Sequence, residues 1–405
     1  MMKKNQSKNA AKLIPFLLIL IILVSVLTDF RAEMFVIDGV AGEEAEESFE
    51  THMNSATYIN SDFPINNDSP GINDSSVTNN FPGINDLPVT NGAFINPLTG
   101  LATVDDVSRN RPIAISVSNV RGALPTNATN GISQADIVYE MLVESGITRL
   151  VALYQDFSNV GVVGSIRSAR HYTVEIAEAY DAIFIHAGAS PLGFEEIENR
   201  EITNFDAVTG IRDRIFTRDE NRIPGHPVAN YHSVITSGAS FMQWINTYDF
   251  RKMHQNDFRH TLFFSDNPIT SGQPAYDVDV RFSPGKSSSF RYDASQKLYY
   301  MSQFGSQFTD ANNGAPVVFT NLLILEVPVS DLVGHGEGAG RQDMNTVGSG
   351  SGYLVSGGSY IKINWYRTDK AAQFIYTYEH GGIIDLGRGK TYIGLVPPDM
   401  NQSFS

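Results

Sequence analysis

The chain has 405 residues, more than one ordinary hydrophobic core holds, so we expect two folded domains and accessory segments. Its 29 Lys and Arg residues against 44 Asp and Glu residues give a net charge of −15, which argues against general nucleic-acid or anionic-lipid binding. The sequence contains no cysteine, which excludes disulfides, thiolate metal sites, a cysteine nucleophile and a lipid-modified cysteine.

The N-terminal segment predicts a membrane anchor. Lysines are concentrated in residues 1–12, and we expect this basic tail to stay in the cytoplasm. We interpret the apolar residues 13–28 as an uncleaved, single-pass signal anchor that leaves the following domains on the extracytoplasmic side of the cell membrane. The alternative is a cleaved secretory signal and a secreted protein, but a small-x-small cleavage pattern is missing just after Leu27.

Residues 29–95 have the composition of a disordered acidic linker rich in Asn, Pro and Gly. Such a segment buries too little apolar surface to offset the entropy lost on ordering. Residues 70–79 recur with few changes as residues 82–91, but two copies are too few for a solenoid. We interpret the segment as a flexible stalk, with a ligand-binding repeat as the alternative.

The first folded domain is expected over residues 96–260, as a mixed-sheet α/β layer. Two β-branched runs flank Ser145 and Gly146, which is typical of an antiparallel hairpin. Strands are expected at 113–118, 137–144, 148–155 and 182–186, and helices at 168–180, from Ser190 onward and at 238–254.

The second folded domain is expected over residues 261–405 and is predicted to be β-rich. Beyond about Tyr276, aromatic and β-branched runs alternate with turn sequences, and residues 317–329 read as one long apolar strand. Further strands are expected at 353–355, 361–365, 374–378 and 391–396. The chain as a whole is therefore predicted to be α+β.

Two turns form the candidate site. Arg167, Ser168, Arg170 and His171 are expected around the first turn of a helix, where free N–H groups, the helix dipole and guanidinium groups favour an anion. On such a helix, Arg167 and Arg170 are three residues apart and share a face.

The second turn follows the strand that ends at His186 and leads into the helix that begins after Ser190. We expect these two residues to complete the anion site.

The same residues can have structural roles in place of ligand binding. Arg167 and Arg170 can pair with a carboxylate such as Asp181 or Glu175. Arg149 can pair with Glu140 or Glu144 across neighbouring strands instead of reaching the site. A histidine at position 186 can be a satisfied residue of the core.

A series of motifs runs in order along roughly residues 96–400. They are Arg111-Pro-Ile-Ala, residues 133–140, Gly146-Ile-Thr-Arg149, Ile166-Arg-Ser-Ala-Arg170, residues 186–191, Phe216-Thr-Arg-Asp219 and, more loosely, residues 348–353, 362–365 and 389–393. Through these motifs the sequence resembles the YerB-like bacterial family, whose members carry DUF3048 N- and C-terminal domains of unknown function. The resemblance implies a two-part fold carried outside the cytoplasmic membrane, as a lipoprotein or a membrane-anchored form, and supplies no reaction.

Arg218, in one of these motifs, and His226, in the loop that follows it, join the candidate ligand-binding residues. The chain departs from the family pattern at Ser165, where proline is usual, and at residues 225–227, where Pro-His-Asn is common.

Other chemistries find little support in the sequence. The histidines show no HExxH spacing, so no metal is predicted. No Gly-x-Ser-x-Gly elbow surrounds Ser165, Ser168 or Ser190, and the glycine-rich residues 334–340 lack Walker lysine spacing. We expect no cofactor and no nucleic-acid partner.

Two hypotheses for function remain. The first is a membrane-anchored, extracytoplasmic protein that binds an anionic cell-envelope ligand through these arginines. The second is an envelope hydrolase or transferase that uses a histidine, His186 or His226, as acid or base beside the same arginines.

Overall fold

The computed structural model describes residues 94–209, 212–266, 271–334, 336, 338 and 340–405. The predicted basic tail, the predicted anchor at 13–28 and nearly all of the predicted linker lie outside the described residues. Within the described ranges, no helix is long and apolar enough to cross a membrane.

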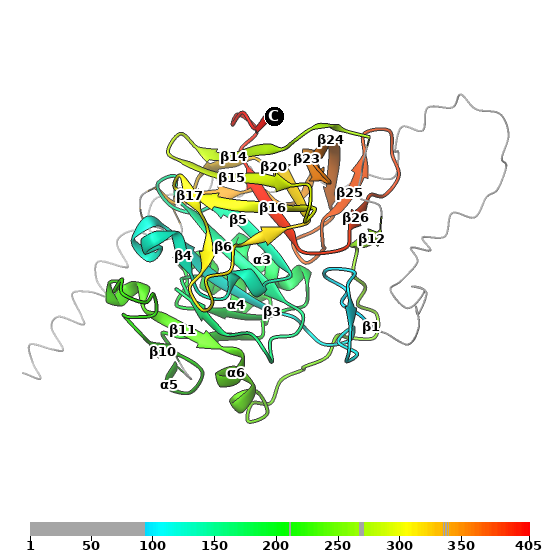
Figure 1. Cartoon of the computed structure of the whole chain (residues 1–405). Coiled ribbons are helices and arrows are strands. Elements are labelled where there is room, and N and C mark those ends of the chain that lie inside the picture. The colour runs from blue at the N-terminus through cyan, green and yellow to red at the C-terminus, as the bar shows by residue number, and fades with distance from the viewer. Residues whose placement is uncertain (1–93, 210–211, 267–270, 335, 337, 339) are drawn as a thin grey trace, which may run out of the picture. The chain divides into compact units, whose positions relative to one another are not determined.

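One 11-stranded mixed sheet runs through the described chain (Figure 1). Strands from the first half and the second half of the chain join where β27 pairs in parallel with β5. Its strands, in spatial order, are β13 (Gln273–Pro274), β24 (Ser359–Arg367), β23 (Gly348–Ser356), β20 (Asn321–Glu326), β27 (Thr391–Val396), β5 (Ile137–Leu142), β6 (Thr148–Tyr154), β3 (Ile113–Asn119), β8 (Ile183–His186) and β9 (Asn204–Asp206), with β25 (Ile375–Tyr378) beside β24.

The two faces of this sheet bury separate hydrophobic cores. In β3, Ile113, Ile115 and Val117 pack into one core and Ala114 into the other. This alternation follows from the two-residue period of a strand. Because both faces are covered, the central strands β3, β5 and β6 are buried along their whole length.

A second sheet and a smaller third sheet cover the first face. Val280, Phe290 and Met301 of the second sheet share a core with Leu322 of the large sheet. The second sheet holds β17 (Ser306–Gln307), β16 (Leu298–Gln303), β15 (Lys286–Asp293), β14 (Asp277–Ser283), β28 (Ser403–Phe404) and β19 (Val318–Phe319); the third holds β10 (Thr217–Arg218), β11 (Val234–Ser237) and β7 (Val162–Gly164).

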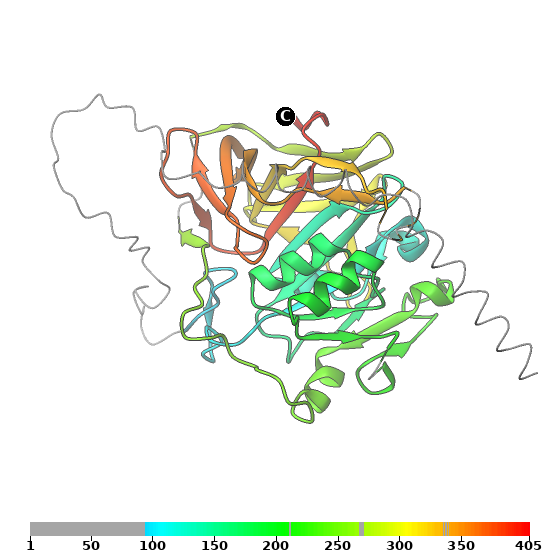
Figure 2. The same ribbon diagram turned by 180° about the vertical axis from the view of Figure 1, so that it is seen from behind.

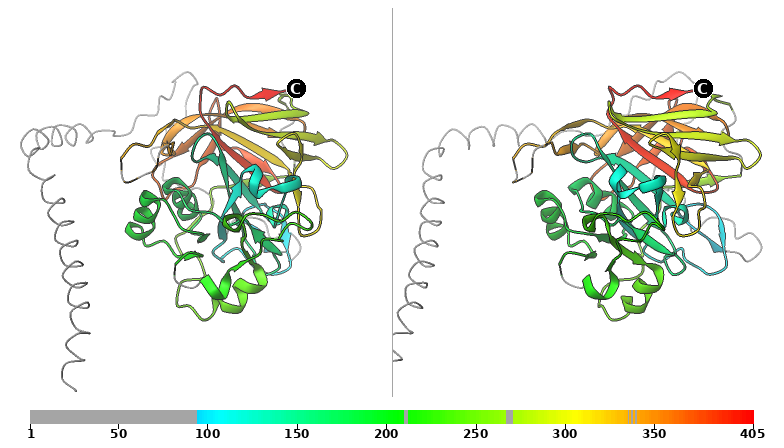
Figure 3. Two further views of the ribbon diagram at one scale, coloured as in Figure 1. Left: turned by 90° about the vertical axis from the view of Figure 1, so that its left-hand side faces the viewer. Right: turned by 60° about the vertical axis from the view of Figure 1, so that its left-hand side comes forward.

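Short helices lie on both sides of the large sheet. Helix α3 (His171–Ala179) buries Tyr172 and Ile176 in the second core, and α4 (Pro191–Asn199) packs beside it, as the two green helices in Figure 2 show. Helix α6 (Gly238–Ile245) buries Phe241 in the first core, and α5 (Arg212–Ile215) is a single turn. The views in Figure 3 show α3 and α4 on the side of the strands away from the second sheet.

Short strand pairs and 3-10 turns complete the described fold. The strands are β1 (Phe94–Ile95), β2 (Ala102–Thr103), β4 (Ala128–Thr129), β12 (Phe263–Ser265), β18 (Thr309–Asp310), β21 (Val329–Asp331), β22 (Gln342–Met344) and β26 (Asp385–Gly387); the 3-10 turns are η2 (Arg121–Ala123), η3 (Pro125–Asn127), η4 (Ile132–Gln134) and η5 (Asn230–His232).

The predicted α+β class, with an α/β layer domain followed by a β-rich domain, is wrong. Strands dominate the described residues in both halves of the chain, so the protein is largely β. Helices α3 and α4 cover only one face of the large sheet, and the other face is covered mainly by strands. The helix predicted to reach residue 254 ends at Ile245, which removes much of the expected helical content.

A buried polar network joins the second sheet to the large one. Glu140 on β5 is fully buried, and its carboxylate lies 3.1 Å from the Lys286 ammonium of β15. It also accepts hydrogen bonds of 2.7–2.8 Å from the side chains of Asn119, Thr148, Ser288 and Tyr392. A buried carboxylate needs such partners, because an uncompensated charge is costly in the interior.

Candidate functional site

The two turns chosen from the sequence lie side by side. Residues 165–170 follow β7, and residues 187–190 follow β8, which ends at His186. The Ala187 and Ala169 N–H groups donate to the carbonyls of Arg167 and Gly188 at 3.1 and 2.9 Å. The Ser190 N–H donates to the Ala169 carbonyl at 3.1 Å. The starts of α3 and α4 are therefore held together by backbone hydrogen bonds.

The expected helical face shared by Arg167 and Arg170 is not present. Arg170 is the N-cap of α3 and has extended backbone angles, φ −123° and ψ 154°. The Arg167 N–H donates to the Ser116 carbonyl of β3 at 2.9 Å, so this residue lies before the helix. The two side chains consequently leave an extended segment, and the three-residue helical spacing does not apply.

Three arginines gather around one carboxylate. Arg149 of β6 and Arg170 are buried, and they contact Glu144 at 3.3 and 2.7 Å. Arg149 also donates to the Ser168 carbonyl at 2.5 Å, and Arg170 to the Ala169 carbonyl at 2.8 Å. We call Arg149, Arg167 and Arg170 with Glu144 the arginine cluster.

The structure shows which of the expected carboxylates these arginines contact. Arg149 pairs with Glu144, one of its two expected partners. Arg170 also pairs with Glu144, and not with Asp181 or Glu175 as expected. Asp181 is ion-paired to Arg111, Arg251 and His254, and Glu175 to Arg367 and Lys370. In the described part of the chain, Arg149 and Arg170 form ion pairs with Glu144 alone, and Arg167 forms none.

Arg167 differs from its neighbours because it is only partly buried. It donates to the Tyr231 carbonyl at 2.7 Å, and its guanidinium lies 6.0 Å from the centre of the Tyr231 ring. Burial lowers the pKa of Arg167, the nearby Glu144 carboxylate raises it, and the Arg170 charge lowers it further. Arg167 therefore lies within electrostatic range of Arg170 while keeping access to solvent.

The positively charged guanidinium groups of the arginine cluster lie close enough to repel one another. Burial lowers the pKa of Arg149 to about 9; the Arg170 charge adds to this shift and Glu144 opposes it. Burial alone would raise the pKa of Glu144, but Arg149 and Arg170 bring it below its usual value, with a contribution from Arg341. The Nε atoms of Arg149 and Arg170 are buried and have no hydrogen-bond partner among the described residues.

Arg341 lies beside the arginine cluster but was not predicted from the sequence. Its backbone forms an isolated antiparallel β-bridge with Glu144, which brings the second half of the chain to the arginine cluster. The only signal in the sequence is its position directly after the glycine-rich residues 334–340, which lack the lysine spacing of a Walker phosphate loop. Gly336 approaches Pro191 at the start of α4, and Gly340 approaches Ser145.

Several predicted site residues have structural contacts. His171 is buried with its Nε2 atom 2.7 Å from Asp343. His186 is buried, and its ring nitrogens lie 2.9 Å from the Gly188 carbonyl and 3.1 Å from the Asn204 side-chain oxygen. The Ser190 hydroxyl accepts from the Gly193 N–H as the N-cap of α4.

Ser168 is partly buried beside the second turn, and a Cβ atom added at Gly188 would lie 3.9 Å from its hydroxyl. Ser168 therefore stays close to the partly open side of the arginine cluster.

Arg218 ends β10, and His226 lies in the segment between β10 and β11. Arg218 is exposed and donates to the Asn230 carbonyl at 2.9 Å, next to the turn that Arg167 contacts through Tyr231. His226 is exposed and has no side-chain partner among the described residues. The structure brings Arg218 near the outer end of Arg167, but it shows no contact between His226 and the cluster.

His232 was not singled out as a ligand residue. It is buried, and burial together with the charges of Arg167 and Arg222 lowers its pKa to about 4. This histidine is therefore neutral at pH 7. The residues that the structure describes contain no group of three potential metal ligands.

Both halves of the chain match known domains. Residues 98–248 match the N-terminal domain, and residues 278–393 the C-terminal domain, of the protein family of unknown function DUF3048. The chain belongs to the YerB-like family, as its motifs predicted.

A Bacillus subtilis protein is similar in sequence and in structure. The protein named "Putative lipoprotein YerB" of Bacillus subtilis (strain 168) is 29% identical over 306 residues, which is 74% of this chain and 86% of the relative. The crystal structure of the YerB protein from Bacillus subtilis is similar with a TM-score of 0.64 and 27% identity, over 77% of this chain and 99% of that one.

Proposed function

We propose that this protein is a membrane-anchored, extracytoplasmic binding protein whose arginine cluster holds an anionic group of a cell-envelope ligand. The name of the Bacillus subtilis relative supports a place at the outer face of the cytoplasmic membrane. The chain has no cysteine to carry a lipid, so we assign the anchoring role to residues 13–28. The division into domains at 96–260 and 261–405 is part of the same proposal.

The observation that carries the binding proposal is the charge imbalance of the arginine cluster. Arg149 and Arg170 are ion-paired with Glu144, and Arg167, which has no carboxylate partner of its own in the described chain, lies within electrostatic range of Arg170 and Glu144. Arg149 and Arg170 each have a buried N–H group without a hydrogen-bond acceptor there, and such groups destabilise a folded protein. A phosphate or carboxylate would neutralise the excess charge and supply acceptors.

The position of the cluster also favours an anion. It lies at the start of α3, where the helix dipole and the first N–H groups add positive potential. Arg149 and Arg170 are buried, whereas Arg167 and Ser168 are partly exposed, so the ligand would approach from the side of Arg167. Arg218 extends the basic surface outward, beyond the turn at Asn230.

The enzyme hypothesis gains no support from His186. Its ring is enclosed, stacks on Phe184, and has an oxygen atom within 3.1 Å of each nitrogen. The geometry therefore favours a binding protein over an envelope hydrolase or transferase.

Calorimetric titration of the full chain in detergent with phosphate, diphosphate and acetate, at constant ionic strength, tests the proposal. We expect at least one of these anions to bind, and Arg167→Ala to weaken its binding by about tenfold or more, because a charge-assisted hydrogen bond is lost. Arg281→Ala, which removes an exposed arginine from the second sheet, is the matched control and should bind like the wild type. No binding by the wild type, or equal binding by Arg167→Ala, would refute the proposal.

A further inference from the structure

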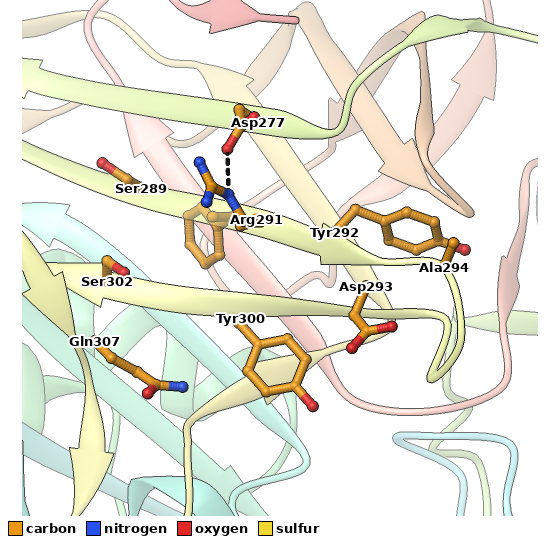
Figure 4. Close-up of a pocket in the computed structure, with 10 residues that line it drawn as sticks. Asp277, Ser289, Arg291, Tyr292, Asp293, Ala294, Tyr300, Ser302 and Gln307 are labelled. Carbon is orange, nitrogen blue, oxygen red and sulfur yellow. Dashed lines mark hydrogen bonds and ion pairs between the residues drawn. The ribbon is translucent and has the colours of Figure 1, made fainter.

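A hollow of about 750 Å³ lies on the second sheet, and the anion-binding proposal does not use it. Figure 4 shows its lining side chains on β14, β15, β16 and β17, with the Tyr300 ring and the Gln307 amide at the front and Arg291 pointing toward Asp277. None of these residues belongs to the arginine cluster.

Strand register explains why the sheet is hollowed here. Asp277, Arg291 and Tyr300 lie opposite one another on three neighbouring strands and form one row of outward-facing side chains. The next row holds Ser289 and Ser302, which are small, and continues to Gln307 on β17. A row of serines beside a row of large side chains leaves space above the sheet.

Several polar side chains of the hollow have no hydrogen-bond partner among the described residues. Within the described ranges, no side chain or backbone group makes a hydrogen bond to the side chains of Tyr300, Ser302 or Gln307. Arg291 donates from Nε to Asp277 at 2.8 Å, which leaves its terminal N–H groups available. Phe290, which also borders the hollow, is buried in the first core and anchors β15 from beneath.

The charges in the hollow are already balanced locally. Arg291 is paired with Asp277, and both side chains are more than half exposed. The Asp293 carboxylate accepts from the Ser295 hydroxyl at 2.6 Å and from two backbone N–H groups of its own turn. An anion would meet two carboxylates and one engaged guanidinium, so the hollow favours an uncharged ligand.

We propose that this hollow binds a neutral saccharide chain. The exposed face of Tyr300 offers an apolar surface for the C–H face of a pyranose ring. The serine hydroxyls, the Gln307 amide and the free N–H groups of Arg291 are placed to bond sugar hydroxyls around it. The hollow and the arginine cluster would then recognise different chemistries, a sugar and an anion.

Calorimetric titration of the full chain with neutral tetrasaccharides tests this inference. The probes are β-1,4-linked N-acetylglucosamine, β-1,4-linked glucose and α-1,4-linked glucose. At least one should bind, and Tyr300→Ala should weaken its affinity by about tenfold, since the stacking surface is lost. Tyr366→Ala, at a similarly half-buried tyrosine on β24 of the large sheet, is the control and should bind like the wild type.

A second variant fills the hollow without touching the tyrosine. Ser302→Leu should abolish saccharide binding while the melting temperature shows that the protein remains folded. Arg167→Ala should leave saccharide binding unchanged, so that this test and the anion test fail independently. The inference is overturned if no tetrasaccharide binds or if binding survives both Tyr300→Ala and Ser302→Leu. Self-association that Tyr300→Ala abolishes would assign the hollow to a second copy of the chain and would also overturn it.

Discussion

At the residue scale, the arginine cluster is defined by an excess of guanidinium groups over carboxylates. The sequence identified Arg167 and Arg170 because they lie in one short motif. It left open whether Arg149 paired with Glu140 or Glu144, because both carboxylates lie near it in the predicted hairpin. In the structure, Glu140 is ion-paired with Lys286, whereas Glu144 is ion-paired with Arg149 and Arg170. The choice of ion-pair partner depends on packing between strands that are distant in sequence. It therefore cannot be predicted from a local sequence pattern.

A buried histidine predicts how stability depends on pH. His260 is almost fully buried, neither ring nitrogen has a hydrogen-bond partner among the described residues, and His254 lies beside it. Burial, with a contribution from the charge of His254, lowers the pKa of His260 to about 3 from the ordinary 6.5, while Asp181 opposes the shift. Between these values the unfolded chain binds a proton that the folded chain does not. Stability therefore falls as the pH falls from 6.5 toward 3.

His260→Phe should remove this dependence while keeping an aromatic ring in the core. Urea unfolding gives the free energy of unfolding of the variant and of the wild type. We expect the difference, variant minus wild type, to be about 2 kcal/mol larger at pH 4.5 than at pH 7. His226→Phe, at an exposed histidine, serves as the control and should not change the pH profile. Parallel pH profiles for wild type and His260→Phe would contradict the account.

At the scale of elements, most strands of the large sheet and the helix starting after Ser190 were predictable. The hairpin of β5 and β6 and strands β3, β8, β24 and β27 are confirmed, because apolar β-branched runs between turns mark them directly. The predicted helix over 168–180 begins only at His171, since the preceding residues bond to neighbouring strands. The predicted long strand at 317–329 is divided among β19, β20 and β21.

The start of α4 gives a test of the assignment of Ser190. Its hydroxyl accepts from the Gly193 N–H, so we assign it to helix capping and not to ligand binding. Ser190→Ala should lower the free energy of unfolding by about 1 kcal/mol, and Ser190→Asp, which also caps helices, should restore most of it. Urea unfolding measures both changes. Ser190→Ala should leave anion affinity unchanged, and a large loss of anion binding with normal stability would show that the hydroxyl serves the ligand.

At the scale of the whole described chain, the two halves are built around one sheet. The parallel pairing of β27 with β5 joins segments more than 200 residues apart in sequence, and Glu140 links β5 to Lys286 and Ser288 of the second sheet. The sequence predicted two consecutive domains from local periodicity, and their boundary near residue 260 stays a prediction. Pairing between distant strands, and the covering of one face by another sheet, arise from long-range packing and could not be read from it.

Contacts between distant parts of the chain also limited how much of the candidate site and of the hollow could be predicted from the sequence. The two turns were found in the sequence because each has its own motif, whereas Arg341 comes from the other half of the chain. The hollow was not predicted, because Arg291, Tyr300 and Gln307 meet only through strand register. Motifs therefore located the two turns of the proposed anion site, whereas the hollow arises from strand register.

The central claim, that the arginine cluster holds an anion, is tested most directly by locating one. Crystals of the full chain soaked in selenate, a tetrahedral dianion, would show its position in an anomalous difference map. We predict a peak within about 3 Å of guanidinium nitrogens of Arg167 and Arg170. Peaks only at other surface positions, or no peak while Arg170 stays paired with Glu144 and Arg167 with the Tyr231 carbonyl, would contradict the account.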